Sequence, residues 1–420
     1  MRRFGYADRQ WPWTSNLTLG FVPEETVVRV PIGWATAVSV AGLLALSCCF
    51  AADPKPKDNP TTDASKLVVH EWGTFSTFSG SDGKNLKFNP YDNDLPDFVH
   101  GYLGRNSKAG PLGGTISLET PVIYFYTDQP LTASVRVDFP KGTLTEWYPH
   151  AGRTDKRLTW DGIKVLPGES MTLPEEKKAS RYYAARETDA VPLRVKFYHQ
   201  EQGRMATEQE KFLFYRGVGT FDMPLSVRAA ADGNFTVGWK GKAPECDLIL
   251  VRVQAGKVRF QPFRLTQQSR GDAQADVRLP AADSTADKLG QTVVQLLTDR
   301  GLLEKEARAM VKTWSFDWFG EDGTRILYLV PSRLTDELLP LRITPKPSAL
   351  LRVLVGRHDV LTPERESDID VLVKKLDGPS PGEAKASDRA LNELGRYRWP
   401  AQEASRARLK GVKEPRREKK

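Results

Sequence analysis

The stretch that decides the fold runs from Glu119 to His150 and reads ETPVIYFYTDQPLTASVRVDFPKGTLTEWYPH. Its middle part, Leu131–Phe139, alternates apolar and polar residues without interruption. Side chains of a β-strand point alternately to opposite faces, so this alternation indicates a strand with one buried and one solvated face. Sheets with one solvated face are typically antiparallel. The stretch therefore predicts three consecutive strands of an antiparallel sheet.

Residues 66–265 repeat this pattern of short alternating segments separated by turn signals. The clearest turn is Asp161-Gly162, because Asp-Gly between alternating apolar residues favours the tight turn of a β-hairpin. We expect about eleven short strands in this part of the chain, which is typical of a β-sandwich or of two packed sheets. The predicted fold class is therefore mainly β, with an antiparallel, sandwich-like N-terminal domain over 66–265.

The hydrophobic period changes from two to about 3.6 near Ala282, which indicates helices after a run of strands. Helices are expected over 283–298, 304–314, 332–338 and 362–376, and strands over 325–330 and 350–355. Thr362-Pro363 is a typical helix start, with a capping Thr before Pro at the first helical position. The sequence predicts a small α/β domain over 282–376, followed by a linker and basic tail over 377–420 that is largely disordered.

The N-terminal segment Pro31–Ala52 contains no charged residue and reads PIGWATAVSVAGLLALSCCFAA. An apolar centre that follows Arg29 and precedes small residues is typical of an export signal, and cleavage before Ala52 satisfies the small-x-small rule. We therefore expect a signal peptide over 1–51 and a proline-containing linker over 52–65.

Features of this segment leave alternatives open. A charged leader is normally much shorter, so translation that starts at Val27 or Val28 is one interpretation, with residues 1–27 as a mis-started leader. About 20 apolar residues suffice to span a bilayer, so the segment could stay uncleaved and associate the protein with a membrane. Ala45-Leu46-Ser47-Cys48 faintly resembles a lipoprotein processing box. All of these interpretations place the rest of the chain outside the cytoplasm, in the periplasm, at the cell envelope or secreted.

The distribution of charge argues against one class of partner, and the cysteine count argues against an internal disulfide. The net charge is +8, but residues 405–420 alone carry eight Lys and Arg against two Glu. A basic excess confined to a tail does not make a nucleic-acid-binding surface on the folded body, so no nucleic-acid partner is expected. Cys246 is the one cysteine outside the leader, so an intramolecular disulfide is excluded for the mature chain.

Two histidines and two glutamates form a candidate metal site. Glu146 and His150 end the opening stretch, and period two turns them toward the core together with Leu144. A buried carboxylate costs several kcal/mol unless a cation, a hydrogen-bond donor or a metal balances it. If His70 and Glu71 converge with this pair, the four residues could bind zinc, which lowers the pKa of bound water toward about 7. The other interpretation is that His70 and Glu71 are a structural pair at the edge of the core.

Aromatic residues beside the same carboxylates suggest a carbohydrate site. Trp72 follows Glu71, and Trp147 and Tyr148 follow Glu146. Flat aromatic rings stack on sugar rings, and a pair of carboxylates can act as acid and base in glycosidic cleavage. Trp72, Trp147 and Tyr148 are therefore candidate ligand-binding residues, with packing in the core as the other interpretation.

Function is predicted only at the level of class, and the sequence leaves open whether the protein is an enzyme. The chain contains no Gly-x-Ser-x-Gly, Walker or dinucleotide-binding fingerprint, which argues against the common serine hydrolases and nucleotide-dependent enzymes. We expect an exported cell-envelope protein of non-catalytic binding or structural type, which binds a glycan or a protein partner and needs no cofactor. The alternative is a metal-assisted hydrolase with zinc held by His70, Glu71, Glu146 and His150.

Overall fold

The computed structural model describes residues 66–89, 94–101, 113–242, 244–245, 247–269 and 271–411. The expected signal peptide, the linker over 52–65 and Cys246 lie outside the described residues. No helix in the described part of the chain has both the length and the hydropathy that a membrane crossing requires.

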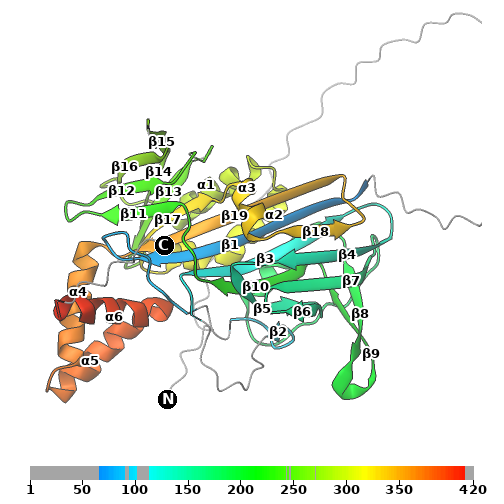
Figure 1. The fold of residues 1–420 in the computed structure, drawn as a ribbon, viewed down its shortest axis with the longest axis horizontal. Helices are drawn as coiled ribbons and strands as arrows, with labels where there is room; N and C mark the ends of the chain where they lie inside the picture. The colour runs from blue at the N-terminus through cyan, green and yellow to red at the C-terminus, as the bar shows by residue number, and fades with distance from the viewer. Residues whose placement is uncertain are drawn as a thin grey trace, which may run out of the picture. The chain divides into compact units, whose positions relative to one another are not determined.

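In the described residues, nine strands form the largest sheet (Figure 1). Their order across the sheet is β14 (Lys257–Phe263), β13 (Leu248–Gln254), β17 (Gly323–Leu329), β19 (Ala349–Val360), β1 (Val68–Ser79), β3 (Ile116–Tyr126), β10 (Leu213–Gly219), β5 (Gly142–Tyr148) and β2 (His100–Gly101). Strands β1 and β19 pair in parallel over their whole length, whereas their other neighbours pair antiparallel.

The middle of this sheet is buried on both faces. Strand β1 has no exposed residue, which explains why its sequence shows a nearly continuous buried run instead of alternation. On one face, an apolar cluster joins side chains of all three sheets of the described chain, including Phe75 of β1, with Trp160 and Phe235. On the other face, Trp72 of β1 packs with Leu289 and Met310 in a second cluster.

Two smaller antiparallel sheets accompany the large one (Figure 1). One contains β11 (Leu225–Ala229), β12 (Asn234–Trp239), β16 (Ala273–Arg278) and β15 (Thr266–Gln267), in that order. The other contains β18 (Leu341–Thr344), β4 (Leu131–Asp138), β7 (Arg157–Val165), β8 (Leu193–His199) and β9 (Arg204–Glu210), with β6 (Gly152–Thr154) paired to β7. Along β4 the apolar positions are buried in alternation with more exposed ones, as the opening stretch predicts.

The described chain contains six α-helices, and two of them begin at a capping threonine. The six helices are α1 (Ala286–Thr298), α2 (Glu304–Ser315), α3 (Ser332–Leu338), α4 (Pro363–Leu376), α5 (Pro381–Asn392) and α6 (Arg398–Leu409), with the short turns η2 (Arg181–Arg186), η3 (Gln200–Gln202), η4 (Phe316–Gly320) and η5 (Gly395–Tyr397). The hydroxyl of Thr285 caps α1, and that of Thr362 caps α4. The predicted fold class is confirmed: the described chain is mainly β, with several antiparallel sheets and a helical C-terminal part.

The division into domains differs from the sequence prediction. Strands β17 and β19, which come from the predicted α/β domain over 282–376, lie between β13 and β1 of the predicted sandwich. The described residues between 66 and 411 accordingly belong to one compact unit. The reason is that hydrophobic periodicity shows which face of a strand is buried but not which distant strand completes its hydrogen bonds.

The C-terminal segment is more ordered than its composition suggests. Residues 381–409, predicted as part of a disordered tail, contain α5, η5 and α6. Leu391, Tyr397 and Ala401 from this segment are buried in a third apolar cluster with Phe78 of β1 and Ile369 of α4. The few apolar residues of this segment have the spacing that helix packing requires. Because charged residues outnumber them, the overall composition of the segment indicated disorder. Residues 412–420 of the predicted tail lie outside the described residues.

Candidate functional site

The predicted metal ligands His70 and Glu71 lie on opposite faces of β1. His70 Nδ1 lies 2.9 Å from Glu306 Oε2 of α2, and Tyr126 donates a hydrogen bond of 2.8 Å to the same carboxylate. Glu71 instead accepts a hydrogen bond from Arg352. Successive side chains of a strand point in opposite directions, so these two residues cannot share one ion.

The other two predicted ligands, Glu146 and His150, each have different neighbours. Glu146 accepts a hydrogen bond from Thr145, and His150 stacks on Phe197 with ring centres 4.1 Å apart. Among the described residues, no group of three or more His, Cys, Asp or Glu side chains is placed to hold a metal ion. The structure thus separates the four residues of the predicted zinc site. The premise that a buried carboxylate needs a partner holds for Glu71, but its partner is a guanidinium.

The predicted aromatic platforms face the interior. Trp72 is fully buried, and Trp147 and Tyr148 are 9% and 3% exposed. Trp72 packs beside Tyr124 in the cluster that α1 and α2 cover. All three side chains are buried, which argues against their forming a carbohydrate platform. Sequence patterns do not separate a core tryptophan from a surface one, because both occur beside polar residues.

Two histidines, His100 and His150, come together beside β9. The ring of His100 lies edge-on to that of His150, with centres 5.5 Å apart. Glu208 accepts a hydrogen bond from the backbone N–H of His150 and contacts His100 Nε2 at 2.9 Å. Burial, together with His100 and His199, lowers the pKa of His150, although Glu208 opposes the shift. This arrangement connects β2, β5 and the β8–β9 hairpin. The spacing of these residues along the sequence did not predict it.

A band of charged and hydroxyl side chains crosses the large sheet between the second and third apolar clusters. We call it the charged belt, and its sheet members are Thr74, Ser76, Ser117, Glu119, Arg216, Arg325, Arg357 and Asp359. All are buried, and residues that lie directly opposite on paired strands share a face. The face of β1 that reads Trp72, Thr74, Ser76, Phe78 is therefore apolar at its ends and polar in the middle.

Each acid of the charged belt has arginine partners. Arg216 donates two hydrogen bonds, of 2.8 and 2.6 Å, to Asp94, which also accepts from Arg181. Burial alone would raise the pKa of Asp94, but these two guanidinium groups outweigh it and lower the pKa below its ordinary range. Asp359 is held in the same way by Arg357 and Arg325. With each acid satisfied internally, the belt fits a structural role.

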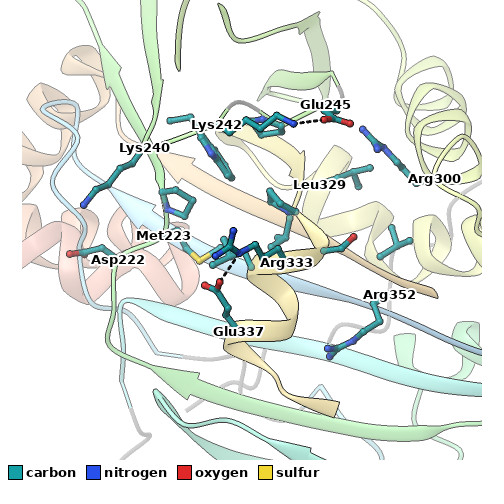
Figure 2. Close-up of a pocket in the computed structure, with 18 of the residues that line it drawn as sticks. Asp222, Met223, Lys240, Lys242, Glu245, Arg300, Leu329, Arg333, Glu337 and Arg352 are labelled. Atoms are coloured by element: carbon teal, nitrogen blue, oxygen red, sulfur yellow. Dashed lines mark hydrogen bonds and ion pairs between the residues drawn. The ribbon is translucent and has the colours of Figure 1, made fainter. Parts of the chain in front are cut away.

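A groove of about 850 Å³ lies between the four-stranded sheet and one end of the large sheet. We call it the basic groove. It is lined by residues of five separate segments, namely 222–224, 239–245, Arg300, 329–337 and 351–353. Figure 2 shows Lys242, Glu245 and Arg300 along one side and Arg333, Glu337 and Arg352 along the other, with Leu329 between them.

The floor of the basic groove is apolar and its rim is mainly basic. The apolar lining includes Met223, Trp239, Leu329, Val330, Leu351 and Val353. Five basic side chains face three acidic ones, which are Lys240, Lys242, Arg300, Arg333 and Arg352 against Asp222, Glu245 and Glu337. No single motif could have found this site, because its charges come from segments spread over more than a hundred residues.

Comparisons with known proteins leave the chain without an assigned family. No family model matches it, and no curated protein matches it. Among solved structures, the yeast delta-COP-I mu-homology domain aligns with a TM-score of 0.23 and 8% identity, covering 72% of this chain and 98% of that one. The same domain complexed with the Dsl1 WxWxV peptide aligns with a TM-score of 0.23 and 7% identity, covering 70% and 96%. A TM-score this low does not establish a common fold, so the site is interpreted from its own geometry.

Arg352 forms a fixed cationic wall of the basic groove. Its Nε donates to Glu71 at 2.6 Å and its Nη1 donates to Asp336 at 2.8 Å. Burial alone would lower the pKa of Arg352, but Glu71 and Tyr215 outweigh it and raise that pKa, so the side chain stays charged. Its Nη2 is buried and has no hydrogen-bond partner in the described chain. The groove can therefore hold an apolar group on its floor and an anionic group at its rim.

Proposed function

We propose that this protein is an extracytoplasmic, non-catalytic binding protein of the cell envelope that takes a segment of a protein partner in its basic groove. The observation that carries the proposal is the groove itself, with about 850 Å³ of space over an apolar floor. Binding sites of this size commonly combine an apolar lining with a few polar groups that orient the ligand. The basic groove has both kinds of lining.

A protein segment suits the groove better than a glycan does. Sugar sites commonly offer an exposed aromatic face for stacking, whereas Trp239, the one aromatic residue of the lining, is 4% exposed. The three aromatic residues that favoured a glycan in the sequence are buried as well. The partly exposed aliphatic residues of the lining, Leu334 and Leu351, instead offer contact area to the side chain of an apolar residue.

The extracytoplasmic location is supported by the sequence of residues 31–52. This uncharged segment follows Arg29 and ends in small residues, as export signals do. A protein partner would then belong to the envelope or to the extracellular space, where the mature chain would meet it.

Photo-crosslinking from inside the groove tests the proposal. A benzophenone amino acid at Glu337, which is exposed on the rim, should crosslink to one defined envelope protein. The same group at Lys196, which is exposed on β8 and outside the groove, serves as the control and should give no such product. The crosslinked protein would then be purified and its affinity measured directly. A Ser332→Trp variant, which fills the groove from an exposed position, should weaken that affinity.

Two outcomes would overturn the proposal. One is equal affinity of the purified partner for the Ser332→Trp variant and the unmodified protein, since the contact would then lie elsewhere. The other is retention of the protein on peptidoglycan or a polysaccharide that Ser332→Trp abolishes, without a protein crosslink at Glu337. That result would assign the groove to a glycan.

A further inference from the structure

We infer that the segment bound in the basic groove is acidic, with carboxylate side chains on both sides of an apolar anchor residue. This inference rests on the proposed function and names the chemistry of the partner. It follows from three properties of the groove: the balance of charge on its rim, the fixed position of Arg352 and the apolar floor.

The rim has basic groups that the protein itself does not neutralise. Lys240 and Arg300 are exposed and form no salt bridge in the described part of the chain. Lys242 pairs with Glu245 at 2.8 Å, but both side chains are more than 70% exposed. Exposed ion pairs contribute little, so a ligand carboxylate can replace the internal one at small cost. The rim therefore attracts negative charge from solution.

Arg352 contributes a cation that is already positioned. Its side chain is held by the buried Glu71 and by Asp336, and Asp336 is 65% exposed. A guanidinium fixed in advance loses little conformational freedom when it binds a carboxylate, and its planar donors match that group. Because Asp336 is exposed, a ligand carboxylate that displaces it would meet Nη1 of Arg352 from the solvent side.

The acids of the rim argue against a uniform polyanion such as a nucleic acid. Glu245 and Glu337 lie on the groove lining between its basic residues, where a continuous row of phosphates would meet like charges. The partly exposed Leu334 and Leu351 of the lining would likewise be left uncovered by a sugar-phosphate chain. A peptide with spaced carboxylates and one buried apolar side chain satisfies both parts of the lining.

Peptides matched in everything but charge test the inference. The probe is a short fluorescein-labelled peptide with Asp and Glu on both sides of one leucine. Its counterparts carry Asn and Gln, or Lys, at the same positions. Fluorescence polarisation should show the acidic peptide binding about tenfold or more tightly than the amide peptide, with the Lys peptide weakest. The preference should shrink between about 50 and about 500 mM NaCl as screening increases.

A charge-reversed rim provides the matched variant. Lys240→Glu combined with Arg300→Glu should weaken the acidic peptide by about tenfold or more and should leave the amide peptide nearly unchanged. The control is Lys196→Glu combined with Lys288→Glu, which makes the same change in net charge at exposed sites outside the groove. The control should bind like the unmodified protein. Thermal melts of both variants verify that each is folded.

The outcomes separate this inference from the proposed function. If the amide and acidic peptides bind equally and Ser332→Trp blocks both, the acidic preference is wrong and the binding role survives. If both double variants weaken the acidic peptide to the same extent, the attraction comes from net charge and the groove assignment is wrong. If no peptide binds and no protein crosslinks at Glu337, both proposals fail together.

Discussion

Nε of Arg352 donates a hydrogen bond of 2.6 Å to Oε2 of Glu71, and both side chains are buried although 281 residues separate them in the chain. This contact connects the first strand, β1, to the wall of the basic groove. Glu71 also accepts a hydrogen bond of 2.6 Å from Tyr215, so one carboxylate positions groups from β19 and from β10. The pair therefore serves both the stability of the large sheet and the geometry of the groove.

Removing the carboxylate of Glu71 should be strongly destabilising. In Glu71→Gln, the cation of Arg352 would keep only the exposed Asp336 as a counter-ion, and the loss of a buried ion-pair partner typically costs about 3–5 kcal/mol. Urea denaturation at neutral pH would measure the change in the free energy of unfolding. Tyr215→Phe is the comparison, because it removes one hydrogen bond to the same carboxylate and should cost about 1.5–3 kcal/mol. A smaller effect for Glu71→Gln than for Tyr215→Phe would contradict this account of the pair.

Buried His358 should make stability fall between about pH 6.5 and about pH 4. Burial lowers the pKa of His358 to about 4, although Asp359 opposes the shift, and its ring lies between the hydroxyls of Thr77 and Ser79. The unfolded chain takes up this proton near pH 6.5 and the folded chain does not. The contribution is therefore fully present above that pH and is lost as pH falls toward 4. The lowered pKa corresponds to about 3 kcal/mol of unfolding free energy.

A His358→Gln variant provides the control for this pH dependence. Gln keeps polar atoms near the two hydroxyls but does not titrate. Its unfolding free energy should be lower than that of the unmodified protein at pH 7.5, and it should decline less between pH 6.5 and pH 4. Parallel declines in the two proteins would show that other groups govern this range.

We expect the ion pairs of Asp94 with the charged belt to affect the free energy of unfolding at a lower pH than His358 does. The pKa of Asp94 is lowered from an ordinary value near 3.8 because Arg216 and Arg181 outweigh burial. A carboxylate with a lowered pKa in the folded state contributes stability that is present above its ordinary pKa and is lost as pH falls through its folded value. The unfolding free energy should decline below about pH 4, and the decline should be shallower in Asp94→Asn. Denaturant titrations between pH 5 and pH 2 would measure it, and an unchanged slope in the variant would remove Asp94 from the explanation.

We expect the packing of the C-terminal helices to contribute to the free energy of unfolding of the protein. Leu391 is fully buried in the third apolar cluster, so Leu391→Ala should cost about 2–5 kcal/mol. Trp399, which is 60% exposed on α6, is the matched control, and Trp399→Ala should change the free energy of unfolding by about 0.5 kcal/mol or less. Chemical denaturation compares the two variants. Equal and small effects would mean that residues 381–409 do not pack on the body of the protein.

The mature protein should begin at Ala52. Intact-mass measurement and N-terminal sequencing of the protein from its native envelope fraction would locate the cleavage site. A chain that retains residues 31–51 in the membrane would favour the uncleaved anchor, and a lipid-modified Cys48 would favour the lipoprotein interpretation. A full-length chain in the cytoplasm would remove the export proposal altogether.

The sequence by itself determined the local features of this protein. Alternation over Leu131–Phe139 predicted β4 with its buried face, and Thr362-Pro363 predicted the start of α4. Each of these features is encoded within a few residues, because strand faces and helix caps depend on the spacing of neighbours along the chain. The sequence also predicted an inward carboxylate that needs a partner, but it placed this carboxylate at Glu146, whereas the structure fully buries Glu71.

The tertiary structure alone decided which distant groups meet. In the tertiary structure β1 pairs with β19, Glu71 pairs with Arg352 and not with a metal, and Trp72 is buried in the core. The tertiary structure also assembled the basic groove from five segments. Periodicity states which way a side chain points, whereas the identity of its partner depends on strand order and register. Strand order and register are set by packing across the whole molecule, in which contacts between residues far apart in sequence matter as much as local ones.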